Sequence, residues 1–106
     1  MTSLTHHMKR GDTSPSIRFT LSPPVNLSGA TVVFSMSPAA GGAITVNRAS
    51  AVIENAALGI VRYDWISGNT AVAGSFVAEF EVSNAGRVET YPNFGHINIA
   101  ITPDIA

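Results

Sequence analysis

Residues 76–82 read Phe-Val-Ala-Glu-Phe-Glu-Val, and this stretch decides the fold class. The apolar residues at 76, 78, 80 and 82 alternate with Val77, Glu79 and Glu81. Successive side chains of a β-strand point to opposite faces, so a period of two gives one apolar and one more polar face. The stretch therefore predicts a strand that buries one face in a core.

The same alternation recurs on both sides of this stretch, between clusters of Gly, Pro, Asn and Ser that favour turns. One segment, 49–58, also fits a helical turn, but the neighbouring hairpin signals favour a strand over 51–54. The expected strands are 15–21, 30–36, 43–48, 50–54, 59–65, 74–82, 87–91 and 95–101. Short strands at this spacing predict an all-β fold, an immunoglobulin-like antiparallel β-sandwich of about seven to eight strands.

The chain has 106 residues, enough for one domain, and carries a formal net charge of −1 with 12% charged residues. We expect an N-terminal tail over 1–10, the sandwich over 11–103, and a short tail at the last three residues. The chain has no cysteine, so it forms no disulfide, which fits folding in a bacterial cytoplasm. It has no basic cluster beyond Lys9-Arg10, no long apolar run and no signal-peptide pattern, so we expect neither a nucleic-acid nor a membrane partner.

The alternation also predicts the core and one strand pairing. The large apolar residues on the inward faces should be buried, namely Phe19, Phe34, Tyr63, Phe76, Phe80, Ile97 and Ile99. Strands 59–65 and 74–82 are expected to form an antiparallel hairpin. One register of that hairpin sets Tyr63 opposite Ala78 and forms an ion pair between Arg62 and Glu79 on the outer face.

Several short sequences, in this order, resemble the N-terminal immunoglobulin-like domain of phage baseplate upper proteins. They run from about 9 to 101 and comprise Lys9-Arg10-Gly11-Asp12-Thr13, Leu27-Ser28-Gly29-Ala30-Thr31, Val33-Phe34, Gly59-Ile60-Val61-Arg62-Tyr63-Asp64-Trp65, Asn69-Thr70, Gly74, Phe76, Ala78-Glu79-Phe80, Glu89-Thr90 and Pro92. The family usually has Asp where this chain has Asn69. The resemblance implies an immunoglobulin-like sandwich in a tail or baseplate protein of a tailed phage or prophage, where such domains anchor an attached part.

No residue pattern indicates catalysis, a cofactor or a metal, so we expect no enzyme and assign no catalytic, cofactor-binding or metal-ligating residue. His6 and His7 lie in the expected tail, and His96 is expected at the surface where a strand begins. Arg10-Gly11-Asp12 matches a cell-adhesion triplet, but Gly-Asp before a strand is also a common turn.

Two further patterns have a structural and a functional interpretation. Asn26-Leu27-Ser28 matches a glycosylation sequon, but a loop with Leu27 inserted in the core is the simpler interpretation. Tyr63 and Trp65 suggest a sugar-stacking platform, and core packing is favoured over it.

The function expected is that of a structural phage or prophage tail or baseplate protein, located in the virion, that docks to other virion proteins. The alternative is a carbohydrate- or host-surface-binding sandwich module. We also expect a homo-oligomer, because the chain has little charge and has apolar residues outside the alternation at Val33, Val77, Leu58, Phe94 and Ile105. The segment before Thr13 and the loops Pro23–Leu27 and Tyr91–Phe94 are the expected contact segments.

Overall fold

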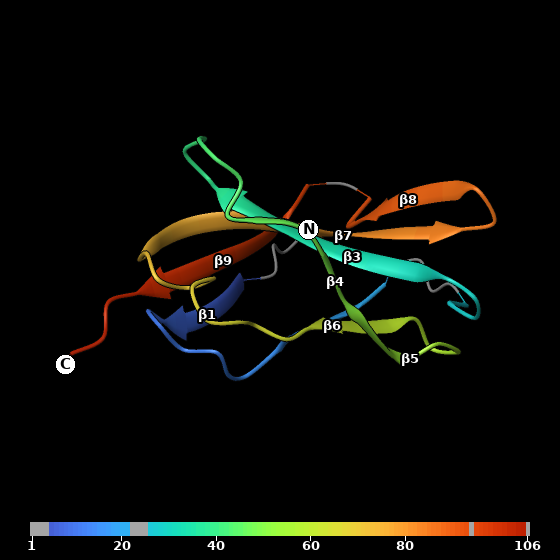
Figure 1. Cartoon of the computed structure of the whole chain (residues 1–106), viewed down its shortest axis with the longest axis horizontal. Coiled ribbons are helices and arrows are strands. Elements are labelled where there is room, and N and C mark those ends of the chain that lie inside the picture. Colours follow the sequence, from blue (N-terminus) through green and yellow to red (C-terminus); the bar gives the residue numbers. More distant parts are fainter. Residues whose placement is uncertain (1–4, 22–25, 94, 106) are drawn as a thin grey trace.

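The computed structural model describes residues 5–21, 26–93 and 95–105, and in these residues the chain is all-β, with nine strands in two facing sheets (Figure 1). The predicted fold class is confirmed. The strands are β1 (Thr5–Lys9), β2 (Ile17–Thr20), β3 (Thr31–Pro38), β4 (Val46–Ser50), β5 (Val52–Asn55), β6 (Ile60–Tyr63), β7 (Gly74–Asn84), β8 (Arg87–Tyr91) and β9 (Ile97–Thr102).

The larger sheet has the strand order β1-β9-β7-β3-β4, with β8 also paired to β7, and the smaller sheet has the order β2-β6-β5. An immunoglobulin sandwich places its second, fifth and fourth strands in one sheet and its third, sixth and seventh in the other. With β4 and β8 set aside, the remaining strands of this chain follow that arrangement, since β2, β6 and β5 form the smaller sheet and β3, β7 and β9 lie in the larger one. Strand β1 pairs in parallel with β9 at the edge of the larger sheet.

The longest strand, β7, organises the larger sheet. One of its edges pairs with β3 from Phe76 to Ser83. Its other edge pairs with β9 over Gly74–Ala78 and with β8 over Phe80–Asn84. Strands β8 and β9 therefore follow one another along the same edge of β7, and the β7–β8 hairpin extends beyond β9 at one end of the molecule (Figure 1).

The core lies between the sheets, and all seven residues predicted to be buried are buried. Phe34 is at its centre: its ring stacks on Tyr63 with centroids 4.4 Å apart and meets Trp65 edge-on. Leu27, in the loop before β3, is 1% exposed and contributes to this core as expected. The face assignment was correct because a strand with alternating side chains buries its apolar face whichever strand it pairs with.

The hairpin predicted between strands 59–65 and 74–82 is wrong. Strand β6 pairs with β2 and β5 in the smaller sheet, whereas β7 lies in the larger one. The intervening residues 64–73 are long enough to cross from one sheet to the other, so Tyr63 lies in the sheet opposite β7 and stacks on Phe34 across the core. Arg62 consequently pairs with Asp64 and Glu54, and the predicted contact with Glu79 does not form.

The predicted N-terminal tail over 1–10 is also wrong for its described part. Thr5–Lys9 forms β1, which lies parallel to β9 with Met8 opposite Ile101. Met8 is 7% exposed and belongs to the core. The alternating pattern that predicts a strand was weak here, because only His6 and Met8 point inward from this short strand. Neither is one of the β-branched or aromatic residues that are enriched in strands.

Most other strands lie within a few residues of their predicted positions. The ambiguous segment 49–58 contains strand β5 and, as favoured, no helix. The strand predicted over 43–48 begins later, at Val46, so that Ile44 lies in the loop before it and is 57% exposed.

Candidate functional site

An apolar surface without charge lies at the end of the sandwich where β7 begins. It is formed by the β3–β4 loop, residues 39–45, and by residues 66–73 of the β6–β7 loop. Neither 39–45 nor 66–73 contains a charged residue. Three large aliphatic side chains there are exposed: Ile44 by 57%, Ile66 by 62% and Val72 by 68%.

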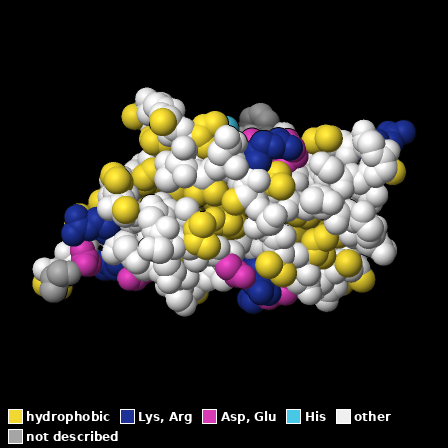
Figure 2. All heavy atoms as spheres, viewed as in Figure 1, with side chains coloured by type: hydrophobic (Ala, Val, Ile, Leu, Met, Phe, Trp, Pro, Cys, Tyr) yellow, Lys and Arg dark blue, Asp and Glu magenta, His cyan; other side chains and the backbone are white. Residues whose placement is uncertain are grey.

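A cleft of about 350 Å³ lies between these two loops. It is lined mainly by small and apolar residues, including Pro38, Ala40, Val72, Ala73 and Phe76. Figure 2 shows hydrophobic side chains at the surface of the left part of the molecule, where Figure 1 places the two loops, and others farther right on the same face. We call this surface, with the cleft and the three exposed aliphatic residues, the apolar end.

Backbone and side-chain hydrogen bonds fix both loops. The Ala39 amide donates to the Ser75 carbonyl at 2.9 Å, which ties the β3–β4 loop to the start of β7. The Asn69 side-chain oxygen accepts from the Tyr63 hydroxyl at 2.8 Å and from the Ile66 amide at 2.9 Å. An Asp at this position would offer the same acceptor, so the connection depends on a side-chain oxygen and not on the amide group of Asn69.

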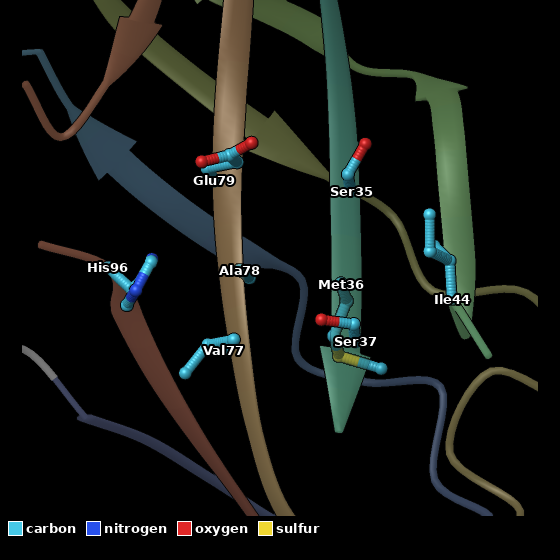
Figure 3. A pocket seen from close by; sticks show the side chains of 8 residues that line it. All are labelled: Ser35, Met36, Ser37, Ile44, Val77, Ala78, Glu79 and His96. Carbon is cyan, nitrogen blue, oxygen red and sulfur yellow. The ribbon is translucent and has the colours of Figure 1, made fainter. Parts of the chain in front are cut away.

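A second, shallower depression lies on the outer face of the larger sheet (Figure 3). Ser35, Ser37, Val77 and Glu79 lie on its strands β3 and β7, with Ile44 and His96 at opposite sides of the view. His96 is exposed just before β9, as expected. The depression combines hydroxyl groups, one carboxylate and one imidazole over a nearly flat sheet surface.

The outer face of the smaller sheet is charged. Arg18 on β2 donates to Glu54 at 2.7 Å, and Arg62 on β6 donates to Asp64 at 2.9 Å. The hydrogen bond from Arg18 lowers the pKa of the Glu54 carboxyl, and the hydrogen bond from Arg62 lowers that of Asp64. These side chains are solvated, so the network contributes little to stability and gives this face a mixed charge.

The Arg10-Gly11-Asp12 triplet forms a structural turn between β1 and β2. The Gly11 amide donates to the Thr70 carbonyl at 2.9 Å, and the Thr70 hydroxyl donates to the Asp12 carbonyl at 2.7 Å. Arg10 forms an ion pair with Asp104 at 2.9 Å. The turn therefore connects the start of the chain to the β6–β7 loop and to the residues after β9.

Tyr63 and Trp65 are 2% and 4% exposed, so the sugar platform suggested by their spacing does not exist at these residues. Their rings meet edge-on, with centroids 5.4 Å apart, inside the aromatic cluster around Phe34. His6 of β1 lies 6.0 Å from Trp65, and burial lowers the pKa of its imidazole. Tyr63 and Trp65 therefore belong to the core.

The expected contact segments are placed as follows. The segment before Thr13 is β1 and its turn, Tyr91 is 1% exposed in the core, and residues 22–25 and Phe94 lie outside the described residues. Among the apolar residues singled out, Leu58 and Ile105 are exposed, whereas Val33 and Val77 are half-buried. Ile66 and Val72 were not predicted from the sequence as exposed contact residues, although the segments 39–45 and 66–73, which contain no charged residue, could have indicated them.

Among the residues that the structure describes, no group of three or more His, Asp or Glu side chains is arranged to hold a metal ion. The described part of the chain also contains no helix that is long and apolar enough to cross a membrane. No protein-family model matches the sequence, and a search of curated proteins finds no match.

Proposed function

We propose that this chain is a structural protein of a phage or prophage tail or baseplate, located in the virion, and that it docks to another virion protein through the apolar end. The observation that carries the proposal is the pair of loop segments without charge, 39–45 and 66–73, with Val72 lining the cleft between the loops and Ile44 and Ile66 exposed on the same segments. The resemblance of residues 9–101 to the immunoglobulin-like domain of baseplate upper proteins supports the same role.

The chemistry of the apolar end fits a protein segment with apolar side chains. Aliphatic side chains exposed together mark interaction surfaces, and the core of a protein interface is depleted of charged residues. The hydrogen bonds of Ala39 and Asn69 hold both loops, so little conformational entropy is lost when a partner binds. This surface needs no catalytic group, in keeping with a role that is not enzymatic.

Co-purification with the proteins encoded next to this chain's own gene tests the proposal. The unchanged chain is expected to retain a tail or baseplate protein, and Ile44→Asp and Val72→Asp are expected to lose it, because each places a charge in a desolvated contact. Ile105→Asp is the matched control, since Ile105 is fully exposed and lies outside the apolar end. Equal retention by all three variants would contradict the assignment of the surface.

A glycan array with the same three variants tests the alternative function. Failure of the chain to bind any neighbouring gene product, together with specific binding of a glycan, would refute docking and favour the carbohydrate-binding module. If the proposal is correct, the unchanged chain and the Ile44→Asp variant give the same result on the glycan array.

A further inference from the structure

The β7–β8 hairpin leaves one strand edge open at the end of the molecule opposite the apolar end (Figure 1). Strand β8 pairs with β7 on one side, and within the described residues no strand pairs with its other side. An open edge offers backbone donors and acceptors to another strand. Val88 is 63% exposed on this strand.

Two other edges of the sandwich, β4 and β5, are irregular in ways that discourage pairing, whereas the edges β1 and β2 pair with their neighbours without a shift. Strand β4 has a register shift opposite β3, with Arg48 at a φ of 52°, and β5 has a register shift opposite β6. Such bulges twist an edge and interrupt its row of hydrogen-bonding groups. Strand β8 pairs with β7 over all five residues without a shift.

The turn determines which groups of β8 point outward. Ala85 and Gly86 both have positive φ, 52° and 81°, as a two-residue type I′ turn requires. The flanking pair Asn84 and Arg87 is then hydrogen-bonded, and bonded pairs alternate along the strands. The backbone groups of Val88 and Thr90 therefore point away from β7. The Thr90 carbonyl is capped by the Asn93 side chain at 2.9 Å, which leaves the Thr90 amide and both groups of Val88 at the edge.

The charges on β8 complement a second copy of the same strand. Arg10, Arg18, Arg48 and Arg62 each form an ion pair with a carboxylate, whereas Arg87 forms none among the described residues. Glu89 lies two positions along the strand on the same face, exposed like Arg87. Its contacts are with uncharged groups, the Asn93 amide at 3.3 Å and the Tyr91 hydroxyl.

We propose that β8 pairs antiparallel with β8 of a second copy of this chain, centred on Val88, so that one sheet runs through both molecules. In this register the two Val88 residues exchange two backbone hydrogen bonds. Arg87 of each copy then lies opposite Glu89 of the other, in a pair without hydrogen bonds, where side chains are closest. The contact is two-fold symmetric, the commonest form of a homodimer.

The two neighbouring registers that use the same outward groups fit less well. Centring on Glu89 sets the two Glu89 carboxylates directly opposite each other, and like charges in that position are destabilising. Centring on Thr90 sets Val88 opposite Pro92, which has no amide hydrogen to donate. Of these three registers, only the one centred on Val88 both sets opposite charges against each other and avoids placing Pro92 opposite an outward-pointing residue.

Cysteine cross-linking tests the register, because the chain has no cysteine of its own. In the proposed dimer the two Cα atoms at position 88 lie about 5.5 Å apart, within the range that a disulfide spans. The two at position 90 lie about 14 Å apart, which is too far. Val88→Cys is therefore expected to form a disulfide dimer at least about tenfold faster than Thr90→Cys under mild oxidation. Equal rates, or faster cross-linking of Thr90→Cys, would overturn the register.

Sedimentation equilibrium with charge variants tests the contact itself. Arg87→Glu is expected to raise the dimer Kd at least about tenfold, because it replaces two attractive pairs by two repulsive ones. The double variant Arg87→Glu with Glu89→Arg restores opposite charges and is expected to restore the dimer. Lys9→Glu, an exposed charge reversal on β1, is the matched control and is expected to leave the Kd unchanged.

Thermal melts of all variants show whether each remains folded. A monomer at every concentration, or a double variant no better than Arg87→Glu, would overturn the proposal. The inference does not rest on the tail role, since β8 and the apolar end lie at opposite ends of β7. An unchanged chain that stays monomeric but still docks to its partner would refute this inference alone.

Discussion

Phe80 contributes from the larger sheet to the aromatic cluster that joins the two sheets. Its side chain is 0% exposed, its ring lies 5.1 Å from that of Phe34, and it stacks on Phe19 of the opposite sheet at 6.0 Å. Phe80→Ala is expected to lower the free energy of unfolding by about 3–5 kcal/mol, because the cavity lies where neither sheet can close it. Urea unfolding measures this, with Ile105→Ala as the exposed control. A Phe80→Ala variant as stable as the parent would contradict the packing.

Burial at the residue scale could be predicted from the sequence, but polar contacts could not. Alternation identified Phe80 and Tyr63 as inward, because each strand has only two faces. It could not identify the bond from the Tyr63 hydroxyl to Asn69, since that depends on how the loop 64–73 folds back over the end of β6. For the same reason, the exposure of Ile66 and Val72 could not be predicted, because it depends on the conformation of this loop.

At the scale of elements, β1 is a structural strand. It covers the edge of β9, places Met8 in the core and sets His6 against Trp65. Removal of residues 1–9 is expected to lower the free energy of unfolding by at least about 2 kcal/mol, the lower end for losing a buried Met side chain. Removal of 105–106 is the control, because Ile105 is fully exposed. A truncated chain that unfolds at the same urea concentration as the parent would show that β1 contributes nothing.

Strand pairing was harder to predict than strand position, and β6 shows why. Its residues identify a strand with Val61 and Tyr63 on the inward face, but the same pattern suits pairing with β7 and packing opposite it. Whether residues 64–73 form a turn within one sheet or a crossing between sheets decides the outcome. Nothing in their composition distinguishes the two.

At the scale of the whole molecule, the two proposed contact surfaces lie at opposite ends of β7. The apolar end lies where β7 begins, and the open edge of β8 lies where β7 ends, with solvated ion pairs on the outer faces between them. One chain could therefore bind a second copy at one end and a different protein at the other. The low charge of the sequence predicted that contact surfaces exist. The positions proposed for them could be found only from the fold.

Mapping the contact by NMR tests the central claim, docking through the apolar end, most directly. The isotope-labelled chain would be titrated with the neighbouring gene product that co-purifies with it, and backbone amide shifts would be followed. If the chain docks through the apolar end, the largest shift changes cluster at 39–45 and 66–73, and Val72→Asp abolishes them. Changes centred instead on the charged face of Arg18 and Arg62, or binding unaltered in Val72→Asp, would contradict it.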